Sequence, residues 1–207
     1  MVRALAVVLG FSVLAGASIA AARPVEDGTR ISILAGARYV PHRHFEQEAE
    51  RTGTPVLSDF PVGPEVIASF AYAPMPAIEI SLELGWAYDQ YELTGTKLVM
   101  QNIPVVATLR WFPFETKFSP YLGAGGGYML GFVSGAPSGE TETHAQEFHA
   151  MVGATYPLSE KIWFVVEDRF QLASGDIVPI GQIQTGGNML SVGLSFVLEP
   201  ARDLAPH

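Results

Sequence analysis

His149 is the residue of this chain whose type and surroundings come nearest to a catalytic group. A histidine can act as a general base when a serine or comparable nucleophile and an acid are held beside it. Glu147 and Met151 lie two residues away on either side, and the three side chains would share one face of an extended strand. No serine stands at either position, so the sequence offers no triad. We therefore predict that His149 has a structural role in the lumen or at its rim, and that the protein is not an enzyme.

Three further histidines are candidates for metal ligands. His42 and His44 are two residues apart, which places them on one side of an extended segment, and His144 could join them from elsewhere in the chain. Zinc sites need three or four ligands, commonly cysteine and histidine, and this chain has no cysteine. The pattern is too sparse to indicate a metal, and we predict neither a metal site nor another cofactor.

The elements that carry these residues have the two-residue period of β-strands. Between Leu190 and Phe196 large apolar residues alternate with serine and glycine, and the segment from Ile78 to Tyr88 alternates in the same way. Alternate side chains of a strand point to opposite faces, so each segment has one apolar and one polar face. Eight such segments are predicted, at 30–40, 65–73, 78–91, 99–112, 121–133, 146–156, 161–173 and 189–198.

The connections between these segments alternate in length. Long polar connections follow every odd-numbered segment, at residues 41–64, 92–98, 134–145 and 174–188, whereas the others are short. An even number of antiparallel strands with long loops at one end and short turns at the other is typical of outer-membrane barrels. The sequence therefore predicts an all-β fold, namely an eight-stranded antiparallel up-and-down transmembrane β-barrel with long extracellular loops and short periplasmic turns.

The polar face of the strands is predicted to line the lumen. A soluble barrel, the alternative, would carry many charges on this face, but Gly123, Gly125 and Gly127 occupy it in one strand. Glycines leave room inside a barrel for larger side chains from opposite strands. The few charges of this face would meet inside, where a charge without a partner is costly. The predicted structural lumen network contains Arg38, Glu79, Glu83, Arg110, Glu147, Glu167 and Arg169.

Asp168 does not fit this arrangement. It falls on the apolar face between Val166 and Phe170, where a charge in the middle of a membrane would be unfavourable. A β-bulge at this point, or a position close to a membrane interface, would resolve the conflict.

Aromatic residues gather toward the two ends of the predicted strands. Membrane barrels carry such aromatic girdles at both bilayer interfaces. The predicted girdle residues are Tyr39, Tyr88, Tyr91, Trp111, Phe132, Tyr156, Phe164 and Phe196.

The composition agrees with an exported membrane protein and excludes other classes. Charged residues make up 16% of the 207 residues, against about 25% in soluble domains, and the net charge of −9 offers no basic face to nucleic acid. Residues 1–22 combine Arg3, an apolar core and a small-residue end, which is the pattern of a signal peptide. We predict a signal peptide at 1–22, the barrel at 23–198, a short tail at 199–207 and a location in the bacterial outer membrane.

The most specific motif is the string from Ser119-Pro120-Tyr121 through the alternating glycines to Tyr128, preceded by residues 102–105 and 109–113. In this motif and in its overall pattern, the chain resembles the small outer-membrane β-barrel family of OmpA/OmpW type. The resemblance implies assembly by the outer-membrane machinery, which reads a terminal aromatic residue. Phe196 takes that place by strand phase, although eleven residues follow it. The OmpW-like relatives imply passage of small hydrophobic solutes.

Three functions remain open from the sequence. The first is a structural barrel, or a narrow conduit for small solutes, with a lumen that side chains fill. The second is a surface-interaction protein that binds a partner or lipopolysaccharide through its long first loop. The third and least favoured is a lipid-modifying membrane enzyme. The expected partners are outer-membrane lipid, lipopolysaccharide and the assembly machinery. Acidic residues able to hold divalent cations against lipopolysaccharide phosphates are Glu46, Glu48, Glu50, Asp59, Glu140 and Glu142.

Overall fold

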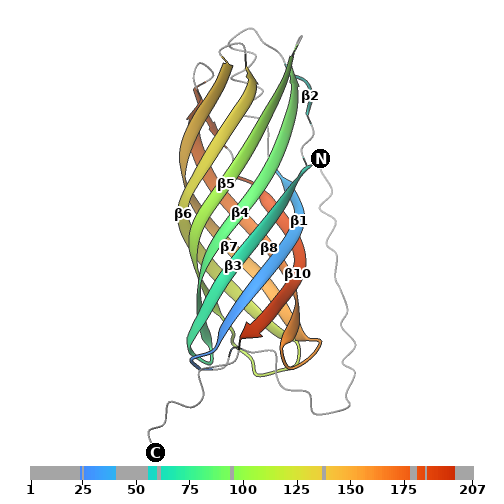
Figure 1. Ribbon diagram of the computed structural model, residues 1–207, viewed down its shortest axis with the longest axis vertical. Coiled ribbons are helices and arrows are strands. Elements are labelled where there is room, and N and C mark those ends of the chain that lie inside the picture. Colours follow the sequence, from blue (N-terminus) through green and yellow to red (C-terminus); the bar gives the residue numbers. More distant parts are fainter. Residues whose placement is uncertain are drawn as a thin grey trace, which may run out of the picture.

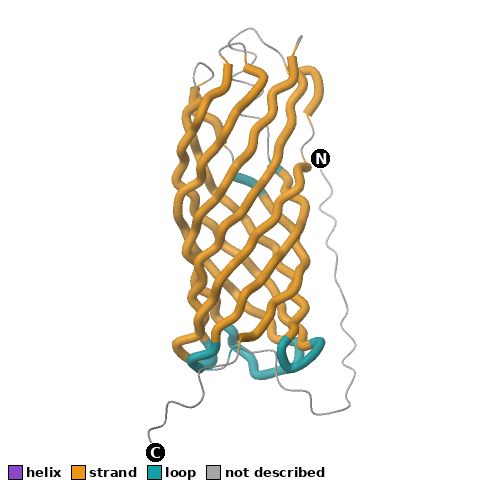
Figure 2. Tube along the Cα trace, in the orientation of Figure 1, coloured by secondary structure: helices purple, strands orange, loops and turns teal. Residues whose placement is uncertain are grey.

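The computed structural model describes residues 24, 26–40, 56–59, 62–93, 96–136, 139–177, 181–184 and 186–198. The predicted signal peptide and C-terminal tail lie outside these ranges. Within them the chain forms strands (Figures 1 and 2). The strands are β1 (Thr29–Tyr39), β2 (Val56–Asp59), β3 (Val62–Met75), β4 (Ile78–Leu93), β5 (Thr96–Trp111), β6 (Ser119–Ala136), β7 (Gly139–Pro157), β8 (Ile162–Ile177), β9 (Gly181–Gln184) and β10 (Asn188–Leu198). No helix in these ranges is long and apolar enough to cross a membrane.

The long strands close into an eight-stranded barrel. Their order is β10-β1-β3-β4-β5-β6-β7-β8, every neighbouring pair is antiparallel, and β8 pairs with β10 to close the ring. The short strand β2 pairs with β4, and β9 pairs with β8. Figure 1 shows the strands winding obliquely around a tall, narrow cylinder. The predicted all-β fold, an eight-stranded antiparallel up-and-down barrel, is confirmed.

The two ends of the barrel differ. The connections at residues 76–77, 112–118 and 158–161 lie at what we call the lower end, at the bottom of Figure 1. The other ends of the strands define the opposite, upper end. Two of the four long loops predicted there are wrong, because β6 runs to Ala136 and β7 begins at Gly139, while β4 runs to Leu93 and β5 begins at Thr96. Strand pairing depends on backbone hydrogen bonds, which polar side chains do not disturb. A hairpin can therefore extend beyond the segment in which apolar side chains alternate.

The barrel is apolar outside and polar inside. Along β3, burial alternates residue by residue from Val62 to Ala73, and the same alternation continues in β1 and β10. The exposed residues are mainly Leu, Val, Ile and aromatic side chains, whereas most buried charged side chains point into the lumen. A small apolar cluster of Leu34, Phe112, Tyr121, Met151 and Val165 also lies inside. This inverted arrangement suits a barrel whose surroundings are lipid.

Candidate functional site in the charged lumen

Arg110 is the centre of an ion-pair network in the lower half of the lumen. Its guanidinium lies 3.0 Å from Glu79 Oε1, 2.6 Å from Glu83 Oε1 and 3.6 Å from Glu167 Oε2. The backbone register explains the first contact, since Glu79 and Arg110 are directly opposite on β4 and β5. Gly123 stands opposite Arg110 on β6, the strand on the other side of β5.

Two more arginines extend this network. Arg30 Nε lies 2.6 Å from Glu79 Oε2, and Arg169 Nη2 lies 2.7 Å from both Glu83 Oε2 and Glu167 Oε1. We call the six residues the lower tier; they are Arg30, Glu79, Glu83, Arg110, Glu167 and Arg169. Within the described residues the tier holds three positive and three negative charges, all buried. Such a mutually paired set meets the requirement for charges in a low-dielectric interior.

Aromatic side chains complete the lower tier. The Tyr121 hydroxyl donates a hydrogen bond to Glu167 Oε2 at 2.7 Å, and the Arg110 guanidinium carbon lies 5.8 Å from the Tyr121 ring centre. Arg30 stands over the rings of Phe112 and Trp163, at 5.7 and 5.2 Å. These contacts add cation–π attraction and fill the space between the ion pairs.

A second set of polar residues, the upper tier, fills the lumen nearer the upper end. Its members are Arg38, Glu65, Asp89, Asn102, Glu147, His149 and Gln171, and all are buried. Arg38 forms an ion pair with Asp89, and its Nε lies 3.4 Å from Glu65 Oε2. Gln171 donates to Glu65 Oε1 at 3.0 Å, and Asn102 donates to Asp89 Oδ2 at 3.3 Å.

His149 contacts a hydroxyl on one side and a carboxylate on the other. Its Nε2 lies 3.0 Å from Thr108 Oγ1, and its Nδ1 lies 3.5 Å from Glu147 Oε1. A hydroxyl, an imidazole and a carboxylate in this order are the groups that a nucleophilic hydrolase uses. All three side chains are almost fully buried, so the described part of the structure presents them to no substrate.

The sequence did not reveal the hydroxyl partner of His149, because this partner lies on a different strand. Thr108 on β5 and His149 on β7 are both in register with Gly125 on β6, which lies between them. A Cβ at Gly125 would lie 2.7 Å from His149 Nε2, so only glycine lets the two side chains meet across this strand. The signal in the sequence was a glycine that stands in register with both residues. This signal can be recognised only when the strand pairing is known.

The structure places all seven predicted lumen residues inside the barrel, but it divides them between the two tiers. Arg38 and Glu147 lie in the upper tier, and the other five lie in the lower tier. Sequence reasoning did not include Arg30, Glu65 and Asp89 in the network. Arg30 is an even number of residues from Arg38 on the same strand, so the alternation already indicated its direction.

Asp168 points outward, as the alternation predicts, and is exposed on the apolar exterior. It stands in register with Val152 on β7 and Leu190 on β10. Neither pairing shows a register shift, so the suggestion of a β-bulge is wrong. The carboxylate therefore lies among lipid-facing side chains.

Six of the eight predicted girdle residues are exposed on the exterior, toward the two ends of the barrel. Tyr39, Trp111, Phe132, Tyr156, Phe164 and Phe196 are exposed. Tyr88 is partly exposed, and the side chain of Tyr91 is not among those that the structure describes. Trp86, Tyr128 and Phe148 are further exposed aromatics, near the middle of β4, β6 and β7.

The histidines and acidic residues considered for metal binding are mostly not described. His42, His44, Glu46, Glu48 and Glu50 fall outside the described ranges, as do the side chains of Asp59 and Glu140. His144 and Glu142 are exposed on β7. No group of three His, Asp or Glu able to hold a metal ion occurs among the residues that the structure describes.

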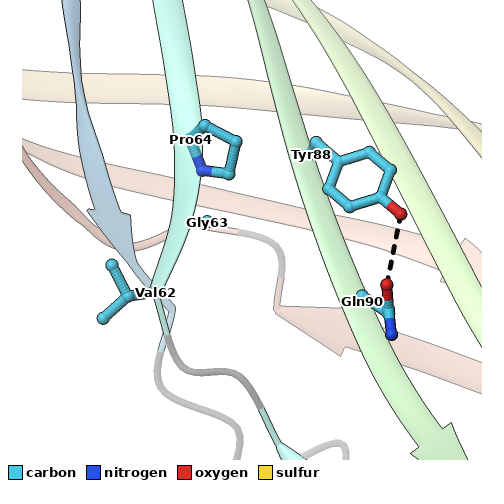
Figure 3. A pocket seen from close by; sticks show the side chains of 5 residues that line it. All are labelled: Val62, Gly63, Pro64, Tyr88 and Gln90. Atoms are coloured by element: carbon cyan, nitrogen blue, oxygen red, sulfur yellow. Dashed lines mark hydrogen bonds between the residues drawn. The ribbon is translucent and has the colours of Figure 1, made fainter.

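A pocket opens in the barrel wall between β3 and β4. It has a volume of about 260 Å³ and is lined by Val62, Gly63, Pro64, Tyr88 and Gln90 (Figure 3). The β3–β4 pairing ends at Glu65 opposite Ala87, and β4 is next paired with β2 at Tyr91. Proline has no N–H to donate to a neighbouring strand, which agrees with the break beside Pro64.

No protein-family model and no curated protein sequence matches the chain. Among solved structures, the chain is similar to the outer membrane protein OprG from Pseudomonas aeruginosa, with a TM-score of 0.59 and 14% identity over 85% of this chain and 98% of that one. It is also similar to Neisserial surface protein A, with a TM-score of 0.50 and 15% identity over 83% of this chain and 97% of that one. The chain therefore has the fold of the small eight-stranded outer-membrane β-barrels.

Proposed function

We propose that this protein is an integral outer-membrane barrel that acts as a structural element of the membrane and not as an aqueous pore. The observation that carries the proposal is the lower tier, in which three arginines and three glutamates pair across the lumen. An eight-stranded barrel has an interior just wide enough for side chains. Opening it for water would require several buried ion pairs to separate, which is costly.

The exterior supports the membrane location. Exposed leucines such as Leu82 and Leu190 cover the middle of the barrel, and Trp111 and Phe132 are exposed aromatics toward its two ends. A soluble protein would bury such a surface, because contiguous apolar patches of this extent favour association in water.

Planar-bilayer recordings test this function. The wild-type protein should show no large, long-lived ohmic steps. The double variant Arg110→Ala/Glu83→Ala keeps the charge balance but shortens two lumen side chains, and it should produce such steps. Leu82→Ala/Leu84→Ala truncates the same number of side chains on the exterior and should remain silent. Large steps from the wild-type protein would refute the closed lumen.

The wall pocket favours a second candidate, the handling of small apolar solutes. Val62, Pro64 and Tyr88 give the pocket an apolar lining on the lipid side of the barrel. The OmpW-type resemblance implies solutes of this kind, and a site in the wall would bind them without a path through the lower tier.

Methyl NMR in detergent tests this candidate with octane as the probe. The Val62 methyl resonances should shift saturably on titration. Val152 is the matched control, since its exposed fraction of 51% is close to the 53% of Val62 but it lies on β7, away from the pocket. Equal shifts at both valines would show that octane only partitions into the micelle.

A further inference from the structure

Asp168 is a charged side chain at the centre of the lipid-facing stripe of β8. The stripe consists of the exposed side chains Phe164, Val166, Asp168, Phe170 and Leu172, so two apolar residues stand on each side of the carboxylate. With a rise of about 3.3 Å per residue and a strand tilt of about 40°, Phe164 and Leu172 each lie about 10 Å from Asp168 along the barrel axis. An aspartate side chain is too short to cover that distance, so the carboxylate stays at membrane depth.

The carboxylate of Asp168 has no partner within the part of the chain that the structure describes. Its neighbours in register are the exposed apolar side chains of Val152 on β7 and Leu190 on β10. An ionisable side chain inside a membrane is unfavourable and commonly marks a functional site. The position of Asp168 therefore requires a counter-charge from outside the barrel.

The surface beside Asp168 is open to a neighbouring molecule. Ala150 and Ala154 on β7 are in register with Phe170 and Val166, so they are diagonal neighbours of Asp168. Their short side chains leave the carboxylate accessible from this side. Asn188 on β10 is also in register with Phe170 and is exposed, so it adds an amide to the same face.

We propose that the exterior of β7, β8 and β10 around Asp168 binds a membrane-spanning segment of another protein that carries a lysine or arginine at the same depth. Charge complementarity selects a cation, and opposite charges attract strongly where the dielectric constant is low. The pairing also relieves the cost of the partner's own cation in lipid. Lipid amines lie in the headgroup layer, beyond the apolar residues that flank Asp168 on both sides, so its depth favours a protein segment.

A second copy of this chain does not offer the required cation at this depth. Of the basic residues that the structure describes, the arginines are buried in the lumen. The described lysines are Lys97, at the upper end of β5, and Lys117 and Lys161, in the lower connections. A symmetric contact through β8 would instead bring two carboxylates together. The surface goes beyond the proposed function, since a structural barrel needs no specific partner.

Fluorescence energy transfer in phosphatidylcholine vesicles tests this surface with the full chain. The chain has no cysteine, so Glu160→Cys places a single label in a lower connection. The probe is a labelled polyleucine transmembrane peptide with one central lysine, and the same peptide with a central leucine is the control. The apparent affinity for the lysine peptide should exceed that for the leucine peptide about tenfold. Equal affinities for the two peptides overturn the proposal.

Two matched substitutions locate the binding. Asp168→Asn removes the charge while keeping the size of the side chain, so it should abolish the preference for the lysine peptide. Glu142→Gln makes the same kind of change at an exposed position near the upper end of β7, and it should keep the preference. A preference that persists in Asp168→Asn would place the binding elsewhere and refute the proposal.

Two further measurements distinguish the other occupants of this face. Adding phosphatidylethanolamine to the vesicles should leave the preference for the lysine peptide intact, whereas its loss would assign the carboxylate to a lipid amine. Energy transfer between differently labelled copies of the barrel should be equal in the wild type and in Asp168→Asn. A loss of that transfer in Asp168→Asn would show that a second copy covers the face. Either of these losses overturns the proposal.

Discussion

Thr108 and His149 lie on strands that do not pair with each other, yet Thr108 Oγ1 is 3.0 Å from His149 Nε2. The strand between them contributes Gly125 at the same level. Because Gly125 has no side chain, the side chains of Thr108 and His149 meet across it. Their contact links three strands of the barrel wall.

Gly125→Ala should separate this pair. The added methyl group would press on the carbonyl oxygen of Ala107 and lie 2.7 Å from His149 Nε2. We expect the free energy of unfolding in detergent to fall by about 2–3 kcal/mol, measured by urea titration. Gly123→Ala is the control, because its methyl group would meet mainly the flexible side chain of Met151. Equal losses in the two variants would contradict the role of Gly125.

Thr108→Val should leave His149 without its hydrogen-bond partner while keeping the shape of the side chain. The expected loss is about 1–3 kcal/mol, the cost of an unsatisfied buried polar group. A double-mutant cycle with His149→Phe measures the coupling energy between the two positions. Additive effects would show that the contact contributes nothing to stability.

Arg110→Leu should strongly destabilise the barrel. The substitution leaves Glu79 and Glu83 with fewer partners in the buried lower tier, and breaking a buried ion pair from one side typically costs about 3–5 kcal/mol. Arg110→Lys keeps the charge but loses the forked geometry, so its unfolding midpoint in urea should lie between those of the other two proteins. An unchanged midpoint for Arg110→Leu would mean that the network does not stabilise the fold.

Asp168→Leu should have the opposite effect and stabilise the protein in lipid vesicles. The carboxylate is exposed among Val152 and Leu190 on the apolar exterior, where a charge is unfavourable at mid-membrane depth. The expected gain in the free energy of unfolding is roughly 1–2 kcal/mol.

Glu142→Leu is the matched control for this gain. Glu142 is also exposed, but it lies near the upper end of β7, so its replacement should change stability little. A loss of stability in Asp168→Leu would show that the carboxylate has a stabilising partner in the membrane.

The alternation of side chains by itself determined the fold class and the direction of each side chain. Residues two apart on a strand share a face whatever the strand pairs with, so Arg38, Arg110 and Glu167 could be assigned to one side before any pairing was known. The same rule indicated that Asp168 faces outward. The strand ends were less predictable, since β6 and β7 remain paired past the apolar stripe, as far as Ala136 opposite Gly139.

Only the tertiary structure decided which inward residues meet. Ring closure and register place Arg30 beside Glu79, 49 residues away, and Gln171 beside Glu65, 106 residues away. They also separate the lower tier from the upper tier, although residues of both tiers lie on the same strands. Contacts of this kind depend on the relative height of strands around the whole barrel, which no local pattern along one strand contains.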